Sequence, residues 1–136
     1  MNEPSKEVQQ KYMELQMMQQ QVQQVQQQVE ALEAQAEEMD AVLQILDDFA
    51  VAKPGSESFV TLTPGLFVKA RIEETDKVLL NVGGGAVVEK SVPEAKKVIA
   101  VQAAELRKLQ EELAGQMQKL AINAQSAQEE LRKLLQ

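Results

Sequence analysis

The residue types that most often carry chemistry are missing from this chain, which has no cysteine and no histidine among its 136 residues. Thiolate and imidazole metal ligands, cysteine nucleophiles, disulfides and triads with an imidazole base are therefore excluded. Carboxylate pairs occur at Glu73-Glu74, Glu111-Glu112 and Glu129-Glu130. They lie in a predicted turn or on solvated helix faces, where nothing prepares them for acid–base work. We expect no enzyme activity, no metal and no cofactor.

The glycine run Gly83-Gly84-Gly85 is the other pattern that could bind a ligand. A phosphate-binding loop needs a helix N-terminus directly after the glycines and, in a P-loop, a lysine followed by serine or threonine. Here Val87 and Val88 follow, which are typical of a strand. The run therefore predicts a tight hairpin turn. A nucleotide-binding module or enzyme remains only as a third hypothesis, which calorimetry with nucleotides would test.

The composition argues against several other classes of protein. Only one Tyr and three Phe are present, too few for an ordinary globular core, which favours an extended molecule. The apolar runs are short and no secretory signal pattern follows Met1, so we expect no membrane span and a cytoplasmic location. Residues 1–50 carry two Lys and ten acids, a net charge of −8. Such a chain repels phosphate backbones, so we expect no nucleic-acid partner.

The elements that position these residues begin with a heptad repeat in the first 50 residues. Its seam positions a and d are Val8, Lys11, Leu15, Met18, Val22, Val25, Val29, Leu32, Ala36, Met39, Leu43 and Leu46. Only Lys11 interrupts the apolar pattern, and the glutamines between seam positions are good helix formers without charge. The repeat predicts a left-handed coiled-coil helix that ends before Lys53-Pro54-Gly55-Ser56. At about 1.5 Å per residue this arm is roughly 70 Å long.

The segment 59–90 alone has strand character. Turn signals at Pro64-Gly65, Glu73–Asp76 and the glycine run divide it into four strands, approximately Phe59–Thr63, Leu66–Ile72, Val78–Val82 and Ala86–Lys90. In the second strand Leu66, Val68, Ala70 and Ile72 lie on one face, and Lys69, Arg71 and Glu73 lie on the other. Val78-Leu79-Leu80, in contrast, is apolar on both faces. The third strand should therefore be buried on both sides.

A second helix begins at Ser91-Val92-Pro93-Glu94, which reads as a capping box. Its seam positions are Ile99, Ala103, Leu106, Gln110, Leu113, Met117, Leu120, Ala124, Ala127, Leu131 and Leu134. Because the two helices match in length, we expect them to pair antiparallel, with facing residue numbers adding up to about 142. The predicted organisation is a coiled-coil helix over 1–52, a linker over 53–58, two β-hairpins over 59–90 and a coiled-coil helix over 91–136.

A sheet of this size cannot bury its apolar faces alone, and open strand edges pair readily with other chains. We therefore expect an α+β fold in which the two hairpins assemble into an intersubunit β-barrel. The alternative is that the bases of the chain's own helices cover the sheet. The residues predicted to mediate oligomerisation are Val60, Leu62, Leu66, Phe67, Val68, Val78, Leu80, Val82 and Val87.

Apolar residues also occur outside the seam near both chain ends. We name Tyr12, Met13, Met17, Ile122 and Leu135 the tip residues. Met18, Met39 and Met117 occupy the seam and are core residues. If the helices pair as expected, the tip residues cluster and form an adaptable apolar surface that suits many partners. The alternative is that they are scattered surface residues without a function.

Several short motifs in the central part of the sequence resemble those of a known family. Val60-Thr61-Leu62-Thr63, Leu66-Phe67-Val68-Lys69-Ala70, the stretch Asp76–Gly85 and Val87-Val88-Glu89-Lys90 look like the alpha-type subunit of prefoldin, the class of the archaeal alpha subunit and eukaryotic subunit 5. The order helix, two hairpins, helix covers the whole chain. The chain departs from the usual pattern at Ala86, where a tyrosine commonly follows the glycines, and in its glutamine-rich arms.

The resemblance implies a hexamer of two alpha and four beta subunits joined through a double β-barrel. It also implies an ATP-independent chaperone that holds unfolded polypeptides at its coiled-coil tips and delivers them to a group II chaperonin. The second hypothesis is a structural or adaptor coiled-coil protein, or a prefoldin relative that forms homo-oligomeric filaments.

Overall fold

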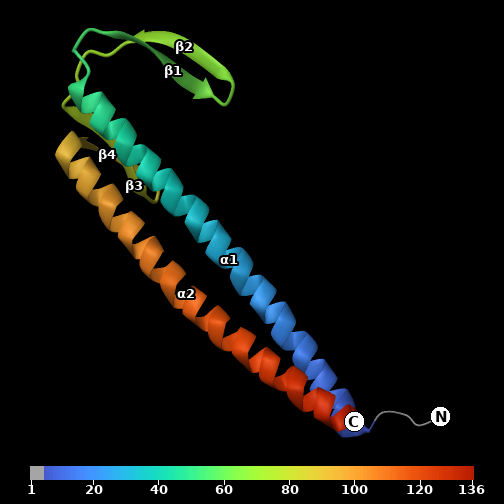
Figure 1. Cartoon of the computed structure of the whole chain (residues 1–136). Coiled ribbons are helices and arrows are strands. Elements are labelled where there is room, and N and C mark those ends of the chain that lie inside the picture. The colour runs from blue at the N-terminus through green and yellow to red at the C-terminus, as the bar shows by residue number, and fades with distance from the viewer. Residues whose placement is uncertain (1–4) are drawn as a thin grey trace. The chain divides into compact units, whose positions relative to one another are not determined.

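The computed structural model describes residues 5–136 as two long helices and two antiparallel hairpins (Figure 1), which confirms the predicted α+β order of helix, two hairpins and helix. The elements in order are α1 (Lys6–Val51), β1 (Glu57–Thr63), β2 (Leu66–Arg71), β3 (Lys77–Gly83), β4 (Ala86–Ser91) and α2 (Val92–Leu135). Residues 1–4, where the first predicted segment begins, lie outside the described part. The chain divides into a terminal unit, residues 5–36 and 105–136, and a hairpin unit, residues 37–104.

The heptad pattern accounts for the burial of α1. From Ser5 to Asp48, the seam residues are buried or half-buried, and all the remaining residues are exposed. In α2 the predicted seam residues from Ile99 to Leu131 are likewise buried or half-buried. Leu134 was predicted at the seam but is 39% exposed, because the helix ends one residue later and offers no further turn to enclose it.

Both helices begin at a serine that caps them. The backbone N–H of Glu94 donates to the Ser91 hydroxyl at 3.2 Å, as the capping box predicts. The backbone N–H of Val8 donates in the same way to the Ser5 hydroxyl at 3.2 Å. The sequence pattern at Ser5 was not recognised, because Val8 takes the place where a capping box has Glu or Gln. Each hydroxyl satisfies one of the N–H groups that a helix start leaves unpaired.

The two hairpins share one construction. In the first, β1 pairs with β2 from Glu57↔Arg71 to Thr61↔Phe67, and the register then shifts before Thr63↔Leu66. The second repeats this, with regular pairing from Lys77↔Ser91 to Asn81↔Val87 and a shift before Gly83↔Ala86. Each bulge therefore precedes a two-residue turn, which is Pro64-Gly65 or Gly84-Gly85. These turns need glycine, since Gly65, Gly84 and Gly85 have φ of 86°, 61° and 76°.

The core of the hairpin unit lies where the two helices meet β3. Leu46, Val92, Ala95 and Ile99 form its buried cluster, and Val78 and Leu80 pack against it. Leu79, on the opposite face of the same strand, is 74% exposed. The chain's own helices thus cover one face of the second hairpin and leave the other face open. The expectation that β3 is buried on both sides is not met within one chain.

Backbone hydrogen bonds join the open end of each hairpin to the neighbouring segment of the chain. The N–H of Gly55 donates to the carbonyl of Ile72 at 2.6 Å, and the N–H of Ile72 donates to the carbonyl of Ser56 at 2.9 Å. These two bonds extend the first hairpin into the preceding linker. The N–H of Val92 donates to the carbonyl of Asp76 at 3.0 Å, which joins the start of α2 to the start of the second hairpin.

Candidate functional site

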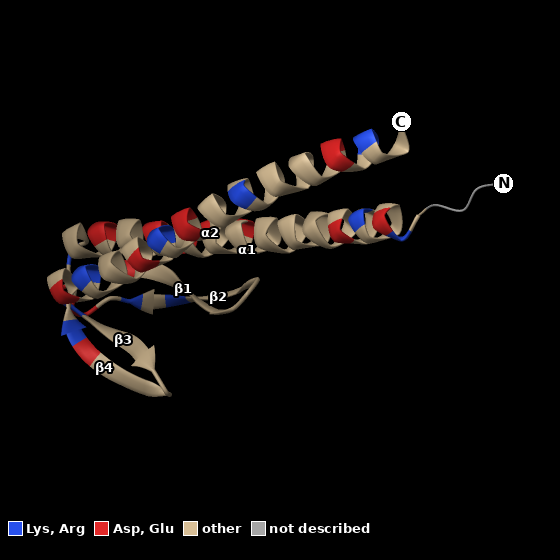
Figure 2. Ribbon diagram, turned by 90° about the horizontal axis from the view of Figure 1, so that it is seen from below, with Lys and Arg blue, Asp and Glu red and all other residues tan. Residues whose placement is uncertain are grey.

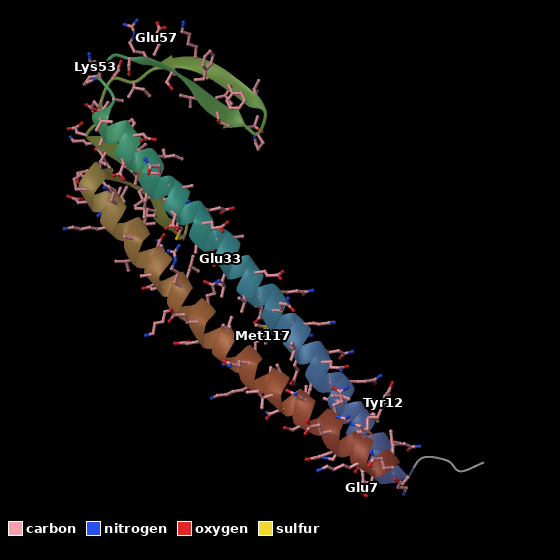
Figure 3. The ribbon with its side chains drawn as sticks, viewed as in Figure 1. Glu7, Tyr12, Glu33, Lys53, Glu57 and Met117 are labelled. Carbon is pink, nitrogen blue, oxygen red and sulfur yellow. The ribbon has the colours of Figure 1, made fainter. Side chains whose placement is uncertain are left out.

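The five tip residues all lie in the terminal unit and are exposed. Their side chains are between 53% and 67% exposed, whereas the neighbouring methionines Met18 and Met117 are half-buried at the seam. Figure 3 labels Tyr12 near the start of α1 and Met117 on α2. Large apolar side chains that are exposed to water in one part of a molecule are candidates for binding another molecule.

The heptad distributes the tip residues over different surfaces of the coiled coil. Met13 on α1 and Ile122 on α2 both take position f, which points away from the partner helix. Tyr12 and Leu135 take position e, and in an antiparallel pair the e positions of both helices line the same edge. Met17 lies one turn after Met13 on α1 and extends its apolar surface. Tyr12 and Leu135 therefore share an edge, while Met13 and Ile122 face opposite ways.

Two polar contacts cross the seam of the terminal unit. The Lys11 Nζ lies 2.6 Å from Oε2 of Glu130, and Nε2 of Gln110 donates to Oε2 of Glu33 at 2.6 Å. The paired numbers add up to 141 and 143, so the helices run antiparallel at close to the expected register. Both contacts use the polar residues that interrupt the apolar seam. Polar seam residues of this kind fix register because any other alignment leaves them unpaired.

The ion pair between Lys11 and Glu130 shifts the pKa of both partners and favours their charged forms. The hydrogen bond and the charge of Glu130 raise the pKa of Lys11, and the hydrogen bond and the charge of Lys11 lower the pKa of Glu130. The Lys11 side chain is 31% exposed and that of Glu130 is 57% exposed, so solvent screens the pair. Its role is to hold the register rather than to carry out proton transfer.

A groove follows one edge of the terminal unit, with a volume of about 390 Å³. Its apolar residues are Leu15 and Val22 from α1 and Ala121 and Ala124 from α2; its polar residues are Gln19, Gln23, Gln125 and Gln128. All eight take positions a, b or e, so the groove lies on the edge that also bears Tyr12 and Leu135. The hollow arises because alanines at positions a and e of α2 leave the space that larger side chains would fill.

Sequence reasoning missed this groove. The signal was present, since Ala121 and Ala124 of α2 fall at positions e and a beside the seam residues Leu15 and Val22 of α1. The glutamines were interpreted only as a solvated helix face.

The residues predicted to mediate oligomerisation divide into two groups. Val78 and Leu80 pack against the chain's own helices, so their inward faces are already covered. The other seven are exposed: Val60, Leu62, Leu66, Phe67, Val68, Val82 and Val87. Phe59 at 71% and Leu79 at 74% are also exposed, although they were not among the predicted residues. Both hairpins thus carry uncovered apolar side chains.

The described residues 5–136 offer no group of three or more acidic side chains that could hold a metal ion. Within the same residues, neither long helix contains an apolar stretch that could cross a membrane.

Comparison with known proteins places the chain by sequence. The family model described as Prefoldin subunit matches residues 18–136. Prefoldin subunit alpha from Methanobrevibacter smithii is 34% identical over 87 residues, and the match covers 62% of this chain and 59% of that protein. Prefoldin subunit alpha from Archaeoglobus fulgidus is 29% identical over 89 residues, covering 65% of each chain. These matches thus span less than two thirds of either relative.

A plant protein and a solved structure are also similar. Prefoldin subunit 5 from Arabidopsis thaliana is 35% identical over 51 residues, which cover 38% of this chain and 34% of that protein. The cryo-EM structure of filamentous PFD from Methanocaldococcus jannaschii has a TM-score of 0.76 at 20% identity and covers 85% of this chain and 95% of its own. At this identity the structural likeness shows a shared fold.

Proposed function

The chain belongs to the prefoldin family, a family of chaperones, and we propose that it is an ATP-independent holdase subunit that captures unfolded polypeptides on the tip residues. The observation that carries the proposal is the exposure of these five side chains, between 53% and 67%. The seam residues from Val8 to Ala36 are buried or half-buried. Outside the tip, Leu109 in the same unit is 45% exposed, and Ile45 and Val101 in the hairpin unit are 63% and 57% exposed. Unfolded chains expose apolar side chains in no fixed order, and flexible methionines suit such variable partners.

The proposal includes the partners that the family resemblance implies. Two such alpha-type chains would join four beta-type prefoldin subunits through their hairpins, and the complex would hand its cargo to a group II chaperonin in the cytoplasm. The exposed apolar residues on both hairpins support assembly, because a monomer would leave them in water.

The test is aggregation of a denatured protein in the presence of this chain, mixed with a beta-type prefoldin subunit. We expect wild type to suppress aggregation and the combined replacements Tyr12→Ser, Met13→Ser, Met17→Ser and Ile122→Ser to lose most of this activity. The matched control replaces exposed glutamines, Gln24→Ser, Gln27→Ser and Gln118→Ser, and should remain active. Circular dichroism would show that both variants keep their helices. Unchanged suppression by the tip variant would overturn the assignment of the tip residues.

A second candidate function is a homo-oligomeric or filamentous assembly of this chain alone. It is favoured by one specific observation, the likeness to a structure described as filamentous PFD. Size-exclusion chromatography with light scattering would separate the two. A filament builder forms very large particles without a partner, whereas the hexamer subunit forms a complex of defined mass only after a beta-type subunit is added.

A further inference from the structure

The groove of the terminal unit combines an apolar floor with amide groups along its rim. Leu15 and Val22 on α1 line this floor together with Ala121 and Ala124 on α2, and two glutamines from each helix flank them. A second hollow of about 270 Å³ is lined by Gln16, Gln19, Gln20 and Gln23. It shares Gln19 and Gln23 with the groove, so the amide-lined surface continues over α1.

The amides at the rim are not engaged by the chain itself. Among the described residues, Gln19, Gln23, Gln125 and Gln128 have no hydrogen bond to a protein group. Each amide offers two donors and one acceptor oxygen. A peptide group offers one donor and one acceptor, so glutamine side chains can satisfy both sides of an extended backbone. The four glutamine amides around this groove therefore offer the donors and acceptors that an extended peptide backbone needs.

The same part of the coiled coil is almost free of charge. Residues 15–29 of α1 contain no charged side chain, and residues 113–128 of α2 contain only Lys119. Lys119 takes position c and is exposed, away from the groove. Figure 2 shows this stretch of α1 as a continuous tan band between its charged turns. A charged ligand would find no counter-ion here, whereas a neutral one avoids the cost of burying an unpaired charge.

We propose that this groove binds a short, extended and uncharged segment of polypeptide through its peptide backbone. From Leu15 to Val22 the helix rises about 10 Å, the length of about three extended residues. Small apolar side chains would enter the hollow above the alanines, and the glutamines would pair with the backbone on both sides. The proposal deepens the proposed function, on which it rests, by naming the class of segment selected: neutral sequences recognised by backbone rather than by side-chain charge.

The probe is a fluorescent peptide of alternating valine and serine, measured by anisotropy with the full chain. Two related peptides test the recognition. In one, alternate backbone nitrogens are methylated, which removes donors without changing the side chains. In the other, glutamate replaces serine. We expect each change to weaken binding about tenfold, the effect of losing one to two hydrogen bonds or burying a charge. Binding of the neutral peptide should not fall as salt is raised.

The variant Gln19→Leu with Gln128→Leu separates amide recognition from simple apolar contact. Leucine keeps the helix and enlarges the apolar surface, so apolar contact alone predicts tighter binding, whereas the proposal predicts about tenfold weaker binding. Gln27→Leu with Gln118→Leu, outside the groove, is the matched control and should bind as wild type does. Ala121→Leu, which fills the hollow, should also weaken binding.

The outcomes distinguish the groove from the tip residues. The serine variant of the tip should bind the peptide normally even where it no longer suppresses aggregation. If the tip variant loses peptide binding and the glutamine variant keeps it, the peptide sits on the tip and the groove proposal fails while the chaperone function stands. Unchanged or tighter binding by Gln19→Leu with Gln128→Leu, equal binding of the methylated peptide, or no binding by wild type would each overturn the proposal.

Discussion

Lys11 shows how a single charged residue is accommodated in an apolar seam. It takes position d, its Nζ lies 2.6 Å from Glu130, and Glu14 on its own helix lies 3.8 Å away. The long aliphatic stem can cover neighbouring apolar groups while the ammonium reaches the surface of the coiled coil. The interruption in the heptad is thus also the point that aligns the start of α1 with the end of α2.

The lowered pKa of Glu130 and the raised pKa of Lys11 predict how stability depends on pH. The pair contributes fully between the ordinary pKa of a glutamate, about 4.3, and that of a lysine, about 10.4. Its contribution is lost as pH falls through the lowered pKa of Glu130, and again as pH rises through the raised pKa of Lys11. Lys11→Leu should remove both losses and keep or raise the melting temperature at neutral pH, because leucine completes the seam.

Thermal unfolding followed by circular dichroism across pH would check this. Lys119→Leu is the matched control: Lys119 takes part in no ion pair in the described part of the chain, so its removal should leave the wild-type pH profile. If Lys11→Leu lost stability at acid pH as steeply as wild type, the pair would not be the cause of the pH dependence.

The elements were predictable where one physical rule dominates. A strict seven-residue repeat can bury only one stripe, and the burial of residues 6–48 of α1 follows it without exception. The glycine turns were equally clear, since positive φ excludes most other residues. It was harder to predict which face of the second hairpin the helices cover. The alternation of side chains along a strand shows which residues share a face, but it does not show which face meets the helices. Val78 and Leu79 are both apolar, and only the folded structure shows that Val78 packs against the helices while Leu79 is exposed.

The groove shows the corresponding limit for function. Its glutamines are ordinary surface residues in the sequence, and their shared edge depends on the exact register of two distant segments. The tip residues could be named from sequence, because apolar side chains outside a seam are conspicuous. Their distribution over separate surfaces required the paired helices.

The hydroxyl of Ser91 caps the start of α2. Ser91→Ala removes the hydroxyl that accepts the Glu94 N–H at 3.2 Å, which should lower the free energy of unfolding by about 1 kcal/mol. Ser126→Ala is the matched control, since Ser126 is an exposed residue inside the same helix and alanine favours helix there. Urea unfolding would measure both variants. Equal effects of the two replacements would show that the hydroxyl of Ser91 does not stabilise the helix start.

At the scale of the whole molecule, the exposed apolar hairpins raise the question of what covers them. The first hairpin carries Phe59, Leu62 and Phe67 in water, with exposed fractions of 71%, 62% and 59%. The second is covered on the Val78 and Leu80 side only. Two-stranded sheets are marginal on their own. The helices therefore cover one face of the second hairpin. The other face of that hairpin and the apolar residues of the first hairpin are left uncovered and are available for assembly.

The neighbours Val78 and Leu79 provide the sharpest test of this division, because they lie on opposite faces of β3. Val78→Lys places a charge against Leu46, Val92, Ala95 and Ile99 and should destabilise the hairpin unit by several kcal/mol. Leu79→Lys changes a side chain that is 74% exposed, so the free energy of unfolding of the dilute chain should change by less than about 0.5 kcal/mol. It should nevertheless weaken assembly, because a new charge would be buried between subunits.

Urea unfolding of the dilute chain and light scattering after mixing with a beta-type subunit give the two readouts. Lys69→Gln is the control for assembly, because it changes a charged, 64% exposed side chain that forms an ion pair with Glu57 on the first hairpin. We expect it to leave the mass of the complex unchanged, since a surface ion pair contributes little. If Leu79→Lys assembled as wild type does, the open face of the second hairpin would not be an interface. If it unfolded the dilute chain instead, that face would be needed for folding rather than for assembly.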